Sequence, residues 1–334
     1  MRALEAGDFS IDALRIVQRP VPQARRGEIL VRIRAASLNY RDLAILVQNY
    51  LPNLPLPYVP ASDCCGEVVA LGEDVVRFKV GDRVMPLYTQ GWYDGKPTLE
   101  MRTRRTLGAP LAGVLAEYVA VPAEDAVSVP ANLSDAEAAT LPIAALTAWT
   151  TLQEGAVKPG DSVLVQGTGG VALFALQFAK LAGARVIILS SSDEKLQRAK
   201  QLGADVGINY RSTPKGEDAV KAATDGRGVD IVVETAGASL AQSLACTTFG
   251  GFVGVVGFVA GYTAEIPLRA LIGPLMRVQG IAVGSRARFE AMNRAIERSG
   301  LKPVIDSHFP LADAAAAFTH LRDGRHFGKI VIDI

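Results

Sequence analysis

A glycine-rich turn carries the most specific chemical signal in the sequence. After a predicted strand at Ser162–Gln166 the chain reads Gly167-Thr168-Gly169-Gly170-Val171-Ala172, and a predicted helix follows over Val171–Ala182. The turn fits the pattern G-x-G-x-x-G/A, in which the first glycine permits a tight turn and the second lets the backbone approach a pyrophosphate. The helix amides and dipole then hold the anion. A purely structural turn is the alternative. The strand–turn–helix context favours a dinucleotide site formed by Gly167, Thr168, Gly169, Gly170 and Val171.

The end of the following strand bears on the choice of dinucleotide. An NAD-binding site usually has Asp or Glu near the position of Ser190, where it binds the ribose 2′-hydroxyl. Here the chain reads Ser190-Ser191-Ser192-Asp193-Glu194-Lys195. Hydroxyls and Lys195 can bind a 2′-phosphate that a carboxylate at Ser190 would repel. Ser192 can also cap the next helix, with two acidic residues in its first turn. The pattern favours NADP and leaves NAD possible.

Composition limits the other possibilities. The 334 residues suit about two domains. A net charge of +1, from 35 basic and 34 acidic residues, argues against a nucleic-acid partner, which requires a basic face. No apolar run approaches the length of about 20 residues that spans a membrane, and the N-terminus lacks the apolar core of a signal peptide. We therefore expect no nucleic-acid partner and no membrane partner.

The cysteines and histidines are few. The three cysteines, Cys64, Cys65 and Cys246, form no evenly spaced disulfide framework, so we expect a cytoplasmic protein. The adjacent pair is interpreted as two small buried side chains rather than a strained vicinal disulfide. The three histidines, His308, His320 and His326, follow no metal-ligand spacing.

Two regions differ in the elements they predict. As far as about Pro130, short strands such as Ile29–Ala36 alternate with Gly/Pro-rich turns, and 88–113 reads as an irregular excursion. A capping box, Ser134 with Glu137, then opens a helix through Ala145 towards Gln153. Strands and helices alternate beyond it, at 162–166, 171–182, 185–189, 193–202, 206–209, 230–235, 239–247 and 252–257. This alternation predicts an α/β fold with a parallel, doubly wound sheet, which 278–283 would extend.

The C-terminal part of the chain is predicted to contain two helices and a final strand. Helices are predicted near Arg288–Arg298 and Asp313–Arg322, followed by a strand over Lys329–Ile334 that we expect to rejoin the first region. The first and last parts of the chain are therefore expected to meet.

Several short segments carry a family resemblance through their order and spacing along the chain: 36–42, 66–72, 80–84, 146–149, 203–205, 208–211 and 327–331. With the glycine turn, they make the chain resemble the medium-chain dehydrogenase/reductase superfamily, in its zinc-independent quinone oxidoreductase-like branch. The resemblance implies a discontinuous GroES-like, mainly-β catalytic domain at 1–126 and 287–334 and a Rossmann domain at 127–286. It also implies a homodimer formed through the Rossmann edge strand.

The chain departs from the zinc-containing alcohol dehydrogenases of that superfamily. They place Cys at the position of Asn39, Gly-His-Glu at the position of Ala61-Ser62-Asp63, and a later Cys near Ile143. Asn and Ser cannot replace thiolate and imidazole as tight zinc ligands. The segment 88–113 contains no Cys, so the structural zinc site is missing as well. We therefore predict no metal.

The lack of zinc ligands bears on which class of compound would accept the hydride. Simple carbonyls usually need a Lewis acid, whereas quinones and α,β-unsaturated carbonyls delocalise the incoming charge, so that hydrogen bonds suffice. Asn39 and Tyr40 are the candidate donors, with Asp42 fixing their loop. Asn39 could instead be a structural turn amide and Tyr40 a core residue. Related sequences often have Tyr five residues after the Asn, where this chain has Ala44. A metal-free alcohol dehydrogenase or carbonyl reductase, and a non-catalytic NADPH-binding redox sensor, remain open.

Further cofactor contacts are implied by the resemblance alone. Thr147 would contact the nicotinamide, and Tyr210 and Lys329 would reach the adenosine phosphate. The ring and ribose would be bordered by Gly257, Phe258, Val259, Val283 and Gly284.

Overall fold

The computed structural model describes residues 1–48, 50–213 and 215–334, which divide into two compact units. Unit 1 comprises Met1–Leu146 and Gly284–Ile334, and unit 2 comprises Thr147–Val283. The helix-rich segment before Leu146 therefore belongs to unit 1, although we assigned residues from 127 onward to the Rossmann domain.

Hydrogen bonds explain why the first segment of unit 1 extends as far as Leu146. The hydroxyl of Ser37 donates to the carbonyl of Ala139 at 2.8 Å, and the amide of Ile143 donates to Asp63 Oδ2 at 2.9 Å. Segment 135–145 thus satisfies polar groups of the unit 1 sheet, which would otherwise be buried without partners.

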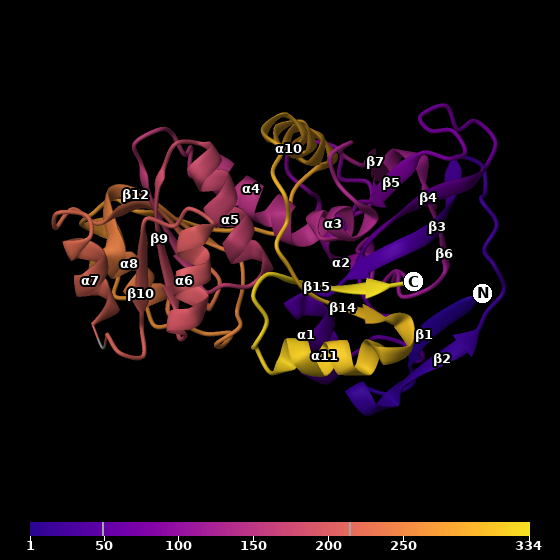
Figure 1. Cartoon of the computed structure of the whole chain (residues 1–334), viewed down its shortest axis with the longest axis horizontal. Helices are drawn as coiled ribbons and strands as arrows, with labels where there is room; N and C mark the ends of the chain where they lie inside the picture. The colour runs from indigo at the N-terminus through magenta and orange to yellow at the C-terminus, as the bar shows by residue number, and fades with distance from the viewer. Residues whose placement is uncertain (49, 214) are drawn as a thin grey trace. The chain divides into compact units, whose positions relative to one another are not determined.

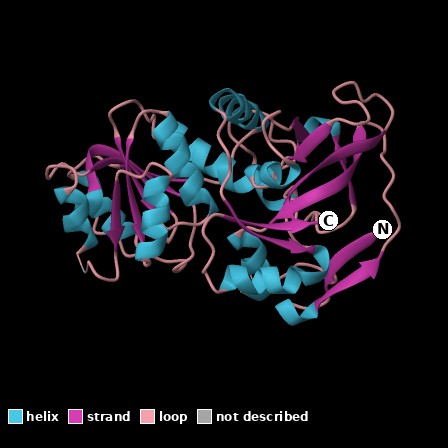
Figure 2. Cartoon of the chain, in the orientation of Figure 1, coloured by secondary structure: helices cyan, strands magenta, loops and turns pink. Residues whose placement is uncertain are grey.

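Unit 2 contains a six-stranded parallel sheet in the order β10-β9-β8-β11-β12-β13. Its strands are β8 (Ser162–Gln166), β9 (Arg185–Ser190), β10 (Val206–Asn209), β11 (Val229–Glu234), β12 (Thr247–Val255) and β13 (Arg277–Gly280). Its helices are α4 (Leu146–Glu154), α5 (Gly170–Leu181), α6 (Asp193–Gln201), α7 (Gly216–Ala222), α8 (Leu240–Cys246) and α9 (Arg269–Ile272). Because the strand order reverses at β8, the predicted doubly wound sheet is confirmed (Figures 1 and 2).

Unit 1 contains a seven-stranded sheet in the order β14-β15-β3-β4-β5-β7, with β6 also paired to β3. These strands are β3 (Glu28–Ser37), β4 (Asp63–Leu71), β5 (Arg83–Pro86), β6 (Tyr118–Pro122), β7 (Ala126–Ser128), β14 (Ile305–Pro310) and β15 (Lys329–Asp333). A separate hairpin pairs β1 (Arg2–Ala6) with β2 (Leu14–Gln18). The predicted return of the tail is confirmed, because β15 pairs antiparallel with β3 (Figure 1).

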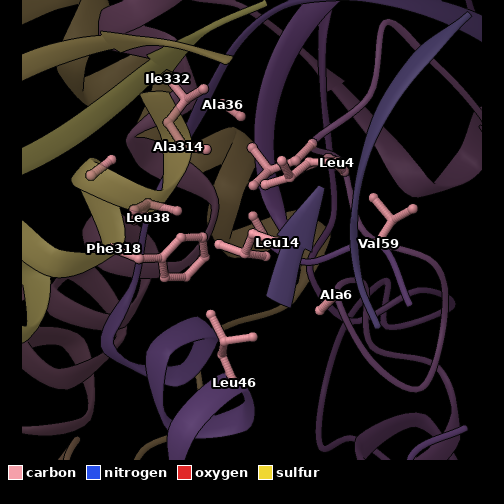
Figure 3. Close-up of a cluster of buried hydrophobic side chains, with 14 of the residues drawn as sticks. Leu4, Ala6, Leu14, Ala36, Leu38, Leu46, Val59, Ala314, Phe318 and Ile332 are labelled. Carbon is pink, nitrogen blue, oxygen red and sulfur yellow. The ribbon is translucent and has the colours of Figure 1, made fainter. Parts of the chain in front are cut away.

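Five helices accompany this sheet in the described part of unit 1. They are α1 (Tyr40–Val47), α2 (Leu99–Arg104), α3 (Asp135–Ala139), α10 (Arg286–Ser299) and α11 (Ala314–Arg322), with short turns η1 (Ile11–Ala13), η2 (Ala123–Asp125), η3 (Leu141–Ala145) and η4 (Leu311–Asp313). Both ends of the chain share one apolar core in this unit: Phe318 of α11 lies among Leu14, Leu38 and Leu46 (Figure 3). Burial of such side chains contributes about 1.5–3 kcal/mol each.

Some local predictions need correction. The helix expected from Ser134 towards Gln153 is interrupted by the π-helical turn η3, which contains Pro142. Proline lacks the amide hydrogen that a continuous α-helix would use. The capping box at its start is confirmed, since Ser134 N donates to Glu137 Oε2 at 2.8 Å and Glu137 N donates to Ser134 Oγ at 3.2 Å. The excursion 88–113 contains the helix α2. Across the described ranges, no helix is long and apolar enough to cross a membrane.

Candidate cofactor and catalytic sites

The glycine turn has the backbone geometry that its sequence predicts. Gly167 has φ +79°, a conformation that side chains with a Cβ rarely adopt, and its amide donates to the carbonyl of Leu189 at 2.8 Å. Gly169 is the N-cap of the 12-residue helix α5 and supplies no side-chain cap. The first-turn amides, including those of Gly170 and Val171, are therefore left for an anion. The turn fits the pyrophosphate of a dinucleotide.

A buried carboxylate braces this turn. Gln166, the last residue of β8, donates from Nε2 to Glu234 Oε2 at 2.8 Å, and Thr235 Oγ1 donates to the Gln166 carbonyl at 3.1 Å. Glu234 is fully buried and also accepts the amides of Ala236 at 2.8 Å and Gly237 at 2.9 Å. Glu234 was not among the residues predicted from the sequence. The available signal was an acidic residue ending the otherwise apolar strand β11.

The predicted adenosine end comes together at the carboxyl ends of β9 and β10. Ser190 is paired with Asn209 across these strands, and its carbonyl accepts the amide of Tyr210 at 3.1 Å. Ser192 caps α6 by accepting the amide of Lys195 at 3.3 Å, as the sequence predicts. Exposed Arg211 follows Tyr210 and was not among the residues we had selected. The edge thus combines hydroxyls with cations, which suits a phosphate.

A second loop lies beside the turn. The amide of Val259 donates to the Thr235 carbonyl at 3.3 Å, and a Cβ on Gly257 would lie only 2.6 Å from the same oxygen. Phe258 stacks on Tyr262 with ring centroids 4.7 Å apart. Three of the residues expected at the nicotinamide and ribose are therefore brought to the carboxyl end of β11.

The remaining expected cofactor contacts lie near the unit boundary. Thr147 is buried at the start of α4, and its carbonyl accepts Thr151 Oγ1 at 2.7 Å. Val283 is buried with φ +65°, a strained conformation for a β-branched residue, and Gly284 begins the second segment of unit 1. Such strain is often found at functional sites.

The candidate catalytic residues lie in unit 1, where β3 leads into α1. Asn39 is the N-cap of α1, and its backbone amide donates to Asp42 Oδ2 at 2.8 Å. Both side chains are buried, Asn39 to 8% exposure and Asp42 to 1%. Asp42 thus fixes the first turn of the helix around Asn39.

Lys329 completes this cluster from the other end of the chain. Its buried Nζ donates to the Leu38 carbonyl at 2.5 Å and to Asn39 Oδ1 at 2.7 Å. We expected Lys329 to reach the adenosine phosphate; that contact stays untested, and the ammonium has these two acceptors within unit 1.

Asp63 is the second carboxylate of the cluster. It accepts the amide of Ile143 at 2.9 Å and the hydroxyl of Ser62 at 3.0 Å. The positions that sequence comparison assigned to zinc ligands, Asn39, Ser62, Asp63 and Ile143, are therefore gathered in one place, and Lys329 reaches the first of them.

Burial controls the protonation of this cluster. Burial raises the pKa of Asp42 to about 7, although the Arg41 guanidinium opposes the shift. Burial likewise raises the pKa of Asp63, and Lys329 opposes that shift. Burial lowers the pKa of Lys329. The charges of Asp63 and, to a smaller extent, Asp42 oppose this shift because they favour the charged ammonium. The ammonium and the carboxylates therefore depend on one another to remain charged.

Three tyrosines, Tyr40, Tyr58 and Tyr88, differ in their environments. The Tyr40 hydroxyl accepts a hydrogen bond from Nε2 of Gln48, the C-cap of the same helix, at 2.9 Å, so it is partly engaged in local structure. Tyr88 is buried beneath the Arg41 guanidinium, which lies 5.1 Å from the ring centroid. Tyr58 was missed because no motif surrounds it. Its buried hydroxyl has no partner among the described residues, and its pKa is raised by burial and by Asp42.

The residues at the ligand positions do not fit a zinc ion. An amide, a hydroxyl and an apolar side chain stand where thiolates and imidazole would be needed, and an ammonium bonds to the amide oxygen. No group of three His, Cys, Asp or Glu in the described part of the chain is arranged to hold a metal ion. The three cysteines are buried free thiols.

Family models match both units. The model described as "Alcohol dehydrogenase GroES-like domain" matches residues 25–131, and the model described as "Zinc-binding dehydrogenase" matches residues 170–298. The chain is 43% identical to a zinc-type alcohol dehydrogenase-like protein of Schizosaccharomyces pombe, over 97% of this chain and 96% of that one. It is 31% identical to a chloroplastic quinone oxidoreductase of Triphysaria versicolor, over 100% and 98%.

Solved structures agree with the fold. A protein of Sinorhizobium meliloti, solved as a candidate alcohol dehydrogenase, superposes with a TM-score of 0.94 at 44% identity, covering 100% of this chain and 98% of that one. An NAD-dependent alcohol dehydrogenase has a TM-score of 0.91 at 35% identity, with both chains fully covered. A mycobacterial protein solved with NADPH has a TM-score of 0.84 at 28% identity, again with full coverage of both chains.

The two folds, the glycine turn of unit 2 and these matches along the whole chain lead to one assignment. The chain belongs to the medium-chain dehydrogenase/reductase superfamily and is an oxidoreductase of that superfamily.

Proposed function

We propose that the chain is an NADPH-dependent, zinc-independent reductase whose acceptor is a quinone or an α,β-unsaturated carbonyl compound. The observation that carries the proposal is the cluster of Asn39, Asp63 and Lys329, which offers hydrogen-bond donors and a fixed ammonium where a zinc enzyme has ligands. Acceptors that delocalise incoming charge can be reduced with hydrogen bonds alone. The quinone oxidoreductase among the relatives supports this acceptor class.

In this proposal unit 2 binds and orients the cofactor. The bound nicotinamide supplies a hydride. The amides of 167–171 hold the pyrophosphate, and the 2′-phosphate is bound by Ser190, Ser191, Ser192, Lys195 and Tyr210, with Arg211 beside them. The nicotinamide and ribose are bordered by Thr147, Gly257, Phe258, Val259, Val283 and Gly284. The relative solved with NADPH supports this cofactor.

In unit 1 Asn39 donates a hydrogen bond to the oxygen on which charge develops. Asn39 Nδ2 is buried and makes no hydrogen bond of ordinary geometry to a described residue, although the Asn39 side chain interacts with Asp63 and lowers the pKa of that carboxyl. A buried donor without a partner costs about 1–3 kcal/mol, a cost that is removed when a ligand supplies the acceptor. Asp42 holds the Asn39 backbone in place, and Tyr40 lies next in the chain as a second donor.

The test is NADPH oxidation with a small quinone, an enone and a saturated ketone, with and without a zinc chelator. We expect saturable turnover of the conjugated acceptors, unaffected by the chelator, and a loss of about 10²-fold in kcat in Asn39→Ala, the size expected for one oxyanion donor. One zinc per chain by elemental analysis would refute the metal-free assignment. Tighter binding of NADH than NADPH would refute the cofactor assignment.

A metal-free alcohol dehydrogenase or carbonyl reductase is the second candidate, because several relatives are named alcohol dehydrogenases. Turnover confined to the saturated ketone or to simple alcohols would favour it. Tight NADPH binding without turnover of any acceptor would instead indicate a non-catalytic redox sensor.

We also propose a cytoplasmic homodimer formed through β13. This edge strand is exposed along its whole length. Exposed apolar side chains continue beside it in sequence: Leu268, Ile272 and Leu275 are each at least 63% exposed. A paired edge would bury them and satisfy the open strand. Light scattering of Val278→Glu tests this: we expect a monomer, whereas an unchanged mass would exclude this edge. The three free thiols support a reducing compartment.

A further inference from the structure

Lys329 is a buried cation that the proposed function does not yet use. Lys329 is 3% exposed, and it comes from β15, 290 residues beyond Asn39 in the chain. Removing an ammonium from water is costly, so a buried ammonium is found where neighbouring groups compensate. Here Leu38 and Asn39 supply oxygen acceptors, and Asp63 and Asp42 supply negative charge.

The bond from Lys329 determines which way the Asn39 amide faces. An amide presents an acceptor oxygen on one side and a donor NH2 group on the other. Since an ammonium has only donors, the Asn39 oxygen must face Lys329 and Nδ2 must face away from it. The Asn39 side chain also lies close enough to Asp63 to lower its pKa, but no hydrogen bond of ordinary geometry occupies Nδ2.

The same bond alters the strength of the donor. A positive charge at the amide oxygen draws electron density from the NH2 group and makes its N–H bonds better hydrogen-bond donors. Hydrogen bonds that follow one another in a chain strengthen one another in this way. The effect is stronger in surroundings shielded from water than in water itself, and Asn39 Nδ2 is shielded. An ammonium acting through an amide can thus deliver part of the electrostatic stabilisation that a metal delivers by direct coordination.

We propose that Lys329 is a positioning residue for the reduction: it orients and polarises the Asn39 amide so that Nδ2 donates to the acceptor oxygen. Asp63, braced by the amide of Ile143 and the hydroxyl of Ser62, keeps the ammonium charged. This inference rests on the proposed function, in which Asn39 contacts the acceptor. It makes Lys329 the resident cation beside the positions at which zinc-dependent relatives have metal ligands.

The experiment is a double-mutant cycle between Asn39→Ala and Lys329→Met, measured as kcat with a quinone and an enone at saturating NADPH. Lys329→Met keeps the length of the side chain and removes the charge. We expect Lys329→Met to lower kcat at least tenfold with the Kd of NADPH unchanged. The double variant should be no slower than Asn39→Ala, because Lys329 acts through that amide.

Lys302→Met is the matched control. Lys302 is in the same unit, 55% exposed in its side chain, and paired with Glu137 at 3.0 Å. We expect this variant to retain the wild-type kcat, since exposed ion pairs contribute little. A loss equal to that of Lys329→Met would overturn the proposal.

The outcomes separate this inference from the function on which it rests. If Asn39→Ala keeps full turnover, the role of Asn39 in the proposed function is wrong. If Asn39→Ala loses turnover but Lys329→Met retains it, the present inference alone is wrong. If Lys329→Met weakens NADPH binding and leaves kcat unchanged at saturation, Lys329 is a phosphate ligand instead.

A second variant is needed in case Lys329→Met does not fold. Lys329→Gln keeps an N–H donor for Asn39 Oδ1 without the charge. An intermediate kcat with an unchanged Kd for NADPH would support the proposal, and a wild-type kcat would overturn it.

Discussion

The side-chain amide of Gln166 donates to the carboxylate of Glu234 at 2.8 Å and so joins the ends of the two central strands of the unit 2 sheet. Glu234 carries no exposed surface and accepts further hydrogen bonds from two backbone amides and two serine hydroxyls. The carboxylate is therefore the common acceptor that holds β8, β11 and the start of α8 in register beneath the phosphate turn.

Glu234→Ala should destabilise the fold by about 3 kcal/mol or more, because it leaves several buried donors unpaired at about 1–3 kcal/mol each. Chemical denaturation followed by circular dichroism measures the loss. Glu265→Ala, at an exposed position in the same unit, should change stability by less than about 0.5 kcal/mol. Equal stabilities of the two variants would contradict this account of Glu234.

Gly167→Ala should weaken NADPH binding and lower stability by about 1 kcal/mol, since φ at this position is +79°. Lack of space in the protein is not the reason, because the nearest atom to an added Cβ is Thr235 Oγ1 at 4.0 Å. Gly216→Ala is the control: it lies in α7 with nothing within 4 Å, and the change should be neutral or slightly stabilising. Fluorescence titration and thermal melting give both quantities, and tight NADPH binding by the Gly167 variant would exclude a pyrophosphate at this turn.

Lys195→Ala should raise the Kd of NADPH about tenfold and leave that of NADH unchanged, because only NADPH carries the 2′-phosphate. Added salt should reduce the difference between the wild type and the variant. Lys200→Ala changes an exposed lysine of the same helix, near its C-terminal end, and should affect neither cofactor. Parallel losses for NADH and NADPH would show that Lys195 does not distinguish them.

Asp42→Asn should change how stability depends on pH. Burial raises the pKa of Asp42 to about 7 in the folded protein, with Arg41, Asp63 and Lys329 as its charged neighbours. The unfolded chain therefore releases this proton near pH 4 and the folded protein only near pH 7, so wild-type stability falls as pH rises between these values. The stability of the variant relative to the wild type should rise across this window, by on the order of 4 kcal/mol, and level off above it. Urea unfolding at pH 5 and pH 8 measures it, and a pH-independent difference would refute a raised pKa.

The cysteines should be inert in the native protein. Burial raises the pKa of all three thiols, that of Cys246 to about 12, and none is exposed. A chromogenic disulfide reagent at pH 8 should label no thiol until denaturant is added and then label all three. Rapid labelling of the native protein at Cys64 or Cys65 would revive a redox role for the adjacent pair.

The parts predicted well from sequence are those encoded by local pattern. The turn at Gly167 combines glycine spacing with a buried strand before it and a mainly apolar helix after it, and all three signals lie within about twenty residues. The Ser134 capping box is equally local. The break at Pro142 could also have been foreseen, because proline removes an amide from the helix it enters.

The parts not predicted depend on contacts between distant segments. Nothing near Lys329 indicates that its ammonium meets Asn39, since the contact exists only after β15 pairs with β3. Tyr58 and Glu234 were missed for the same reason: each is defined by what surrounds it in space. The first unit boundary also depends on packing, through Ser37 and Asp63.

The pairing of β15 with β3 has a consequence for the order of synthesis. Unit 2 is encoded by one continuous segment, Thr147–Val283, and can fold as soon as that segment has left the ribosome. Unit 1 must wait for its final strand, during which time β3 exposes an open edge and Asn39 lacks its cation. The nascent chain is thus able to bind a dinucleotide before it is able to use one.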